Sequence, residues 1–157
     1  MVRAIHHSQD NSSGKLASAF TPSAATRTLP LVRRIMAELI DLDESIKAQQ
    51  EQLRGVDDLV ETIDHKPYLD ELSDVRGSLE DDVRRMQSCI DELASFGVQV
   101  HQPFDGSVDF PALLNRRPVQ LCWHPADDKV EHWHEVGQSS KDRQKLDAAT
   151  VGMVGGY

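Results

Sequence analysis

The clearest hydrophobic pattern in the chain is a heptad-like repeat over residues 30–55. Apolar side chains recur there at spacings of three and four residues, the periodicity of one face of an α-helix. The repeat consists of Val32, Ile35, Leu39, Leu42, Ile46, Gln49 and Leu53, of which only Gln49 is polar. Pro30 and Gly55 bracket it, so we expect a long helix between them.

A second apolar stripe predicts another long helix over about residues 68–96. It is formed by Leu69, Leu72, Val75, Leu79, Val83, Met86, Ile90 and Leu93. Gly77 interrupts the stripe, and a glycine either costs a helix about 1 kcal/mol relative to alanine or permits the close approach of a neighbour. Two long helices with a short connection pack antiparallel, so we expect a coiled-coil-like helical hairpin over about 30–96.

The residues before this hairpin predict a short element and a tail. Thr21 is a good N-cap and Pro22 suits the first helical position, so we expect a short N-terminal helix that Pro30 ends or kinks. Residues 1–19 are polar and small, which is typical of a disordered tail.

After Gly97 the pattern changes from helical to strand-like. Segments 119–124 and 129–136 alternate around "PADD" and predict a β-hairpin, whereas 105–118 holds turn signals and two prolines and is expected to be a loop. Residues 137–157 lose periodicity and are expected to be mostly flexible. The sequence therefore predicts an α+β fold: one domain over 20–136, with the helical hairpin and a small antiparallel sheet over about 98–136 at one end.

The predicted β-hairpin has a preferred register because it holds both tryptophans of the chain. With a five-residue loop, Cys122 faces His132 and Gln120 faces His134. The large apolar side chains then share one face, which comprises Val119, Leu121, Trp123 and Trp133. A four-residue loop would mix tryptophan and histidine on both faces and lose tryptophan burial.

The opposite face of that hairpin would gather four candidate metal ligands: Cys122, His124, His132 and His134. Thiolate and imidazole suit Zn²⁺, and four ligands complete a tetrahedron. The spacing C-x-H-x7-H-x-H is no standard zinc signature, so these histidines could equally be hydrogen-bonded sheet residues beside a cysteine that packs as a small apolar group. Glu135 would lie on the other face and is a poor ligand. A third hypothesis, a Cys–His catalytic pair at Cys122, lacks recognisable oxyanion donors.

Composition narrows the function classes. The formal net charge is −9 over 157 residues, which argues against nucleic acid as a partner. No apolar run approaches the roughly 18–20 residues that span a bilayer, so we expect no membrane partner. Two cysteines and the lack of an apolar export signal favour reduced thiols and a cytoplasmic protein.

Four short motifs occur in an order that resembles a bacterial family, domain of unknown function 2203, over roughly residues 20–143. They are the opening "FTPSAATRTLPLVRRI", "VDFP" at 108–111, "LCW" at 121–123 and "WH" at 133–134. The positions that match the family pattern are Asp109, Cys122, Trp123, Trp133 and His134. The resemblance implies that a metal site common to the family would use Cys122 and His134, with Asp109 or Glu135 as a further ligand. It implies a structural role for the tryptophans and no known activity.

The sequence names no biochemical function, and two hypotheses remain. A hairpin this long exposes more apolar surface than a small sheet can cover, which favours a non-enzymatic interaction or scaffold domain that forms a homodimer through its helices. The alternative is a metal-binding protein or small metalloenzyme, with zinc as the candidate cofactor.

Overall fold

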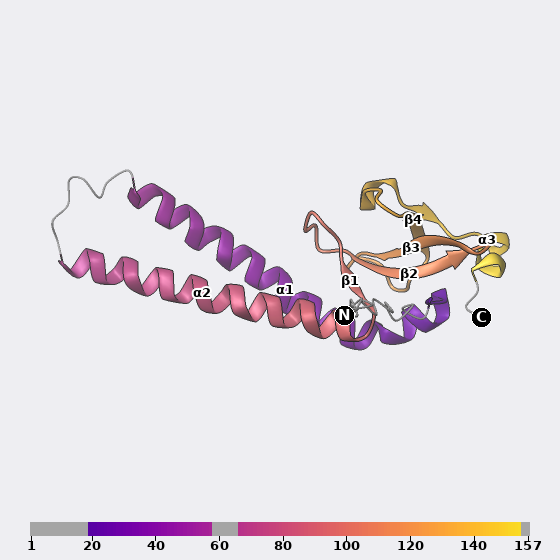
Figure 1. Cartoon of the computed structure of the whole chain (residues 1–157), viewed down its shortest axis with the longest axis horizontal. Coiled ribbons are helices and arrows are strands. Elements are labelled where there is room, and N and C mark those ends of the chain that lie inside the picture. Colours follow the sequence, from indigo (N-terminus) through magenta and orange to yellow (C-terminus); the bar gives the residue numbers. More distant parts are fainter. Residues whose placement is uncertain (1–18, 58–65, 155–157) are drawn as a thin grey trace, which may run out of the picture.

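The computed structural model describes residues 19–57 and 66–154 and has the predicted α+β architecture (Figure 1). Helices α1 (Pro22–Asp57) and α2 (Lys66–Ser95) run antiparallel and form a long arm. A small sheet packs at one end of this arm, over the first turns of α1. Neither helix, nor any other in the described ranges, is long and apolar enough to cross a membrane. Of the predicted tail, residues 1–18 lie outside the description.

Helix α1 differs from the prediction because it continues through Pro30. The prediction of a separate short helix ending at Pro30 is therefore wrong, although Thr21 caps the start of α1, where its Oγ1 accepts the Ala24 N–H at 3.1 Å. A proline costs a helix about 3 kcal/mol. Leu29 and Val32 on either side of it are buried in the core, and their burial, worth about 1.5–3 kcal/mol each, outweighs that cost.

The predicted apolar repeat packs at the helix pair. Its members Val32, Ile35, Leu39, Leu42 and Ile46 are buried. The polar member, Gln49, donates from Nε2 to Ser78 Oγ at 3.0 Å and to Asp82 Oδ2 at 3.1 Å on α2. The amide nitrogen of the one polar position in the repeat thus bonds across the hairpin, whereas its Oε1 is buried and has no hydrogen-bond partner within the described residues.

The sheet has five antiparallel strands in the order β1-β2-β3-β4-β5. The strands are β1 (Gln99–Val100), β2 (Val108–Leu114), β3 (Arg117–Trp123), β4 (His132–Glu135) and β5 (Gln144–Lys145). A 3-10 turn, η1 (Ser140–Asp142), lies between β4 and β5, and a short helix, α3 (Ala148–Met153), follows β5.

The loop expected over 105–118 is a strand and a tight hairpin, so that prediction is wrong. Asn115 and Arg116 have φ values of 49° and 65°, and a two-residue hairpin turn of type I′ requires positive φ at both positions. Pro111 fits because β1 pairs only with Val108 and Asp109 of β2, which leaves the strand edge beside the proline free of β1. Its carbonyl oxygen accepts the Phe20 N–H at 2.8 Å.

The register predicted for β3 and β4 is confirmed. Cys122 pairs with His132 and Gln120 with His134. The predicted apolar face belongs to the core, with Val119, Leu121 and Trp123 buried and Trp133 packed against it. The ladder ends before His124, whose backbone N–H instead donates to Asp127 Oδ2 at 2.9 Å within the connecting loop.

The residues after 136 contain η1, β5 and α3, where we expected a mostly flexible tail. Leu146 and Val154 are buried in the core, and β5 pairs with β4. Elements of two to six residues are too short to show a hydrophobic period, which is why the pattern did not predict them.

One side chain fastens the base of the arm to the sheet. The Arg33 guanidinium donates to the carbonyl oxygens of Asp127 at 2.7 Å, Asp128 at 3.2 Å and Pro125 at 3.4 Å. It also lies 5.0 Å from the centre of the Trp123 ring, which adds a cation–π contact. The β3–β4 loop is therefore held against α1.

Candidate metal centre

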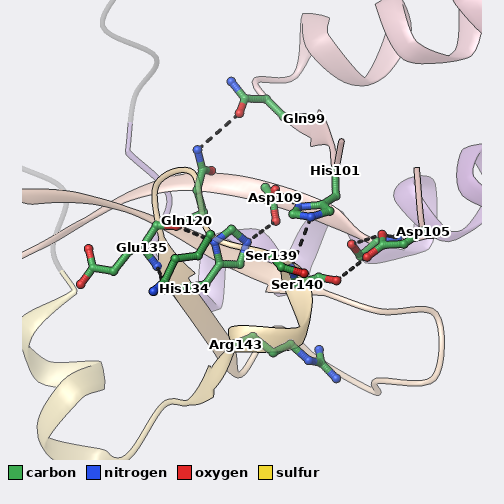
Figure 2. A network of polar contacts seen from close by, with 12 residues as sticks. Gln99, His101, Asp105, Asp109, Gln120, His134, Glu135, Ser139, Ser140 and Arg143 are labelled. Carbon is green, nitrogen blue, oxygen red and sulfur yellow. Dashed lines mark hydrogen bonds and ion pairs between the residues drawn. The ribbon is translucent and has the colours of Figure 1, made fainter. Parts of the chain in front are cut away.

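The sheet face opposite the apolar core carries a buried polar network (Figure 2). The buried polar residues in the described ranges are His101, Ser107, Asp109, His134 and Ser140, and all five belong to this one hydrogen-bonded group. Burying polar side chains is costly unless each finds partners. Their convergence makes this the strongest candidate site on the molecule.

Asp109 is the centre of the network. It projects from β2, and its Oδ2 lies 2.8 Å from Nδ1 of His101, just after β1. Its Oδ1 lies 2.9 Å from Nε2 of His134 on β4. The two imidazole rings meet edge to face at 5.6 Å between their centres. One carboxylate on β2 therefore joins a histidine that follows β1 to a histidine on β4, all on one face of the sheet (Figure 2).

The partners of His134 fix which of its nitrogens carries hydrogen. Nδ1 lies 2.8 Å from the carbonyl oxygen of Glu135, which can only accept, so Nδ1 carries the proton. In a neutral ring Nε2 is then a bare acceptor, facing a carboxylate oxygen that also only accepts. The contact between Nε2 and Asp109 Oδ1 is favourable only with a cation between the two atoms, either a proton or a metal ion.

His101 has the opposite arrangement. The backbone N–H of Ser140 donates to its Nε2 at 3.3 Å, so Nδ1 carries the hydrogen and donates to Asp109. Ser140 is itself held by its hydroxyl, which donates to Asp105. Burial alone would raise the pKa of Asp105, but the hydrogen bonds from Ser107 and Ser140 outweigh it and lower that pKa.

The three central side chains fit a transition-metal ion. The ligand atoms offered by His101, Asp109 and His134 lie within 4.8 Å of one another. Ligands on a tetrahedral zinc ion are about 3.4 Å apart, so the 2.8 and 2.9 Å pairs need to open by about half an ångström. The Nδ1–H of His134 on a backbone carbonyl is the outer contact that aims the Nε2 lone pair of metal-binding histidines.

Coordination by His101 requires one further change. Its Nδ1 must lose the proton to bind metal, and Nε2 must take one up. The Ser140 N–H would then face a second N–H, and the bond between them would break. At 3.3 Å it is the longest contact of the central group, so its loss costs the least.

Cys122 lies beside this centre as a buried thiol. It pairs with Asp109 across β2 and β3. Burial and the negative charge of Asp109 raise its pKa to about 12, against a lowering effect of Arg143. A thiol with this pKa is protonated at neutral pH and is no nucleophile. The ring nitrogens of His101 and His134 already have partners, so neither of these two rings is a free base for a thiol enzyme.

Comparison with known protein families shows to which family the chain belongs. A family model described as "Uncharacterized conserved protein (DUF2203)" matches residues 18–146. The chain belongs to this family. No curated protein and no solved structure matches it. The DUF2203 match spans every residue of the buried network, including Ser140 beyond the predicted domain end at 136.

Of the four ligands predicted from the sequence, the structure brings only His134 into the cluster of His101, Asp109 and His134, with Cys122 alongside. His124 and His132 instead line a surface cleft. The Glu135 carboxylate pairs with Arg117 at 2.6 Å, and only its backbone oxygen contacts His134.

Sequence reasoning missed His101, Ser140 and Asp105. His101 was a single histidine at the end of a short alternating segment. The Asp105-Gly106 turn signal, taken as a hairpin rather than as a loop, would have placed His101 opposite Ser107, whose carbonyl oxygen accepts the His101 N–H at 3.1 Å. Nothing in the local pattern pointed to Ser140.

Proposed function

We propose that the protein binds a divalent transition-metal ion through His101, Asp109 and His134, with Zn²⁺ as the first candidate. The observation that carries the proposal is the contact between His134 Nε2 and Asp109 Oδ1, where either a proton or a metal ion must lie between two acceptors. Two imidazoles and a carboxylate are a donor set that suits Zn²⁺, and also Fe²⁺.

The energetics of the site support this proposal over a purely structural role. A buried charged network adds little stability compared with apolar side chains of similar volume. The other face of the same sheet is covered by buried apolar side chains. Apolar residues could have filled the face under η1 in the same way. Metal binding gives the polar group a function that apolar side chains lack.

The part played by Cys122 separates two kinds of centre. Three protein ligands leave a position open for water or substrate, as in catalytic sites, whereas a fourth ligand from Cys122 would close the centre into a structural one. Cobalt substitution distinguishes them, because a thiolate ligand adds a charge-transfer band that Cys122→Ser removes. We expect no such band, because the ligand atoms that converge within 4.8 Å of one another are those of His101, Asp109 and His134 and do not include the Cys122 thiol.

The test is a zinc titration against a chromophoric chelator, with elemental analysis of protein purified without a histidine tag. We expect one equivalent of zinc, and affinity at least about 100-fold weaker in His134→Ala. His132→Ala is the matched control, because His132 pairs with Cys122 on the same sheet face but stands outside the centre. Equal affinity in wild type and His134→Ala would overturn the proposal. A loss confined to His132→Ala would instead support the ligand set predicted from the sequence.

A second candidate function is self-association through the arm. Leu69 and Val83 on α2 are 47% and 48% exposed, and they lie two heptads apart, so they share one face of the helix. A second copy of the chain supplies a matching apolar stripe, as expected for an isologous dimer. Light scattering after size exclusion tests this: we expect a dimer that Leu69→Glu with Val83→Glu converts to monomer. A monomeric wild type at protein concentrations on the order of 100 micromolar would reject self-association.

A further inference from the structure

A surface cleft of about 420 Å³ lies directly beside the candidate centre. It is lined by His124, Ala126, His132, Ser140, Lys141 and Arg143. Ser140 belongs to both sites, since its backbone N–H contacts His101 in the centre. The cleft volume falls within the range of small-molecule sites.

The charge of the cleft contrasts with that of the chain. The protein carries a formal net charge of −9, yet the cleft lining includes two cations, two imidazoles and no carboxylate. Asp127 pairs with Arg143, at 2.5 Å from Oδ2 to Nη1, and offsets part of its charge. Lys141 is exposed and has no carboxylate partner within the described residues, so its charge is available to a ligand.

One residue of the cleft lining, His132, has a polar atom without a partner. Nδ1 of His132 is buried and makes no hydrogen bond within the described part of the chain. Leaving a buried polar group unpaired costs about 1–3 kcal/mol. A rotation of the ring that brings this nitrogen to the cleft would let a ligand oxygen accept its N–H and recover this cost.

We propose that this cleft binds the oxyanion group, carboxylate or phosphate, of a small molecule held at the metal centre; the link to a metal rests on the function proposed above. Lys141 supplies the unpaired charge, Arg143 a donor already oriented by Asp127, and His132 the unpaired ring nitrogen. Ser140 couples the two sites, because metal binding by His101 releases its N–H next to the cleft.

The experiment titrates inorganic phosphate and, separately, acetate into metal-free and zinc-loaded protein at constant ionic strength. Histidine ring resonances in ¹H–¹⁵N spectra are the readout. We expect saturable shifts at His124 and His132 in metal-free protein, and about fivefold weaker binding in Lys141→Ala. Lys47→Ala is the control, because Lys47 is also an exposed lysine, lies on the arm and pairs with Asp43. The stronger of the two probes identifies the oxyanion.

Each outcome bears on a different claim. Absence of saturable shifts in both forms, or equal affinity in Lys141→Ala and wild type, overturns the cleft proposal. Zinc binding without oxyanion binding overturns the cleft proposal alone and leaves the metal function standing. Oxyanion binding without zinc binding supports the cleft and overturns the metal function.

Discussion

Replacing Asp109 by asparagine separates the structural role of its carboxylate from its proposed metal role. Asparagine has the same shape but offers one acceptor oxygen and one donor NH₂ group. The oxygen would accept the Nδ1–H of His101, and the NH₂ group would donate to Nε2 of His134. Both contacts, now 2.8 and 2.9 Å, keep a donor facing an acceptor, and no cation is needed.

The expected change in the free energy of unfolding is clearest from a comparison with Asp109→Ala. Alanine removes the partner of both rings, and His101 and His134 are only 5% and 2% exposed, so water replaces little of what is lost. Hydrogen bonds to a charged acceptor contribute about 1.5–3 kcal/mol each, and breaking a buried pair costs about 3–5 kcal/mol. We expect Asp109→Ala to lower the free energy of unfolding by about 3–5 kcal/mol, and Asp109→Asn to change it by less than about 1 kcal/mol.

Urea unfolding without and with zinc measures both roles. Zinc at a hundredfold excess over its dissociation constant should add about 2.7 kcal/mol to the wild type. Asp109→Asn should gain almost nothing, because an amide is a poor replacement for a carboxylate ligand. If Asp109→Asn is as unstable without metal as Asp109→Ala, the proton positions assigned to the two histidines are wrong. If it retains the full zinc stabilisation, Asp109 is not a ligand.

Three further predictions concern other parts of the chain. Gly77→Ala should raise the free energy of unfolding by about 1 kcal/mol in thermal or urea melts, because a Cβ there meets nothing within 4 Å; a loss of stability would mean that a neighbour approaches this position closely. With Cys89→Ser as background, labelling of Cys122 at pH 8 should occur only on unfolding, since a pKa of about 12 leaves roughly one thiol in ten thousand ionised; fast labelling of native protein would contradict its burial. Burial alone would raise the pKa of Asp127, but the hydrogen bonds that its carboxylate accepts outweigh burial and lower that pKa. The stabilisation by the ionised carboxylate is therefore complete above the unfolded-state pKa of about 3.9, and it is lost as the pH falls through the lower folded-state pKa. Thermal melts between pH 5 and 2.5 should therefore show a weaker acid dependence in Asp127→Asn than in wild type, with the exposed Asp128→Asn unchanged; equal slopes in both variants would refute this.

The sequence predicted those parts of the fold that depend on the spacing of apolar residues and on the burial of large side chains. The heptad-like repeat from Val32 to Leu53 predicted most of α1. The two tryptophans selected the β3–β4 register, because only one of the two pairings places both on the face that packs on the core. Strand β2 was missed because its turn is Asn115-Arg116, which lacks the usual glycine, and because Pro111 suggested a loop. Side-chain period says nothing about which strand edge stays unpaired.

The site was predictable only in part for a different reason. Asp109, Cys122 and His134 share a sheet face, which alternation can predict. His101 and Ser140 reach the same point from connections outside the strand ladders, and their places depend on how those connections fold over the sheet. Grouping histidines by their nearness in sequence favoured His124 and His132, which the structure places at the cleft instead.

Arg33 joins α1 to the β3–β4 loop at the sheet end of the arm, so a change in the angle of the arm at this point is amplified along its length. From Arg33 to the end of α1 at Asp57 the helix extends about 36 Å at 1.5 Å per residue. A tilt of about 5° at this point would displace the far end by roughly 3 Å over that length. The same loop contains Asp127, which orients Arg143 in the cleft, so a small adjustment at the cleft would be magnified at the opposite end of the molecule.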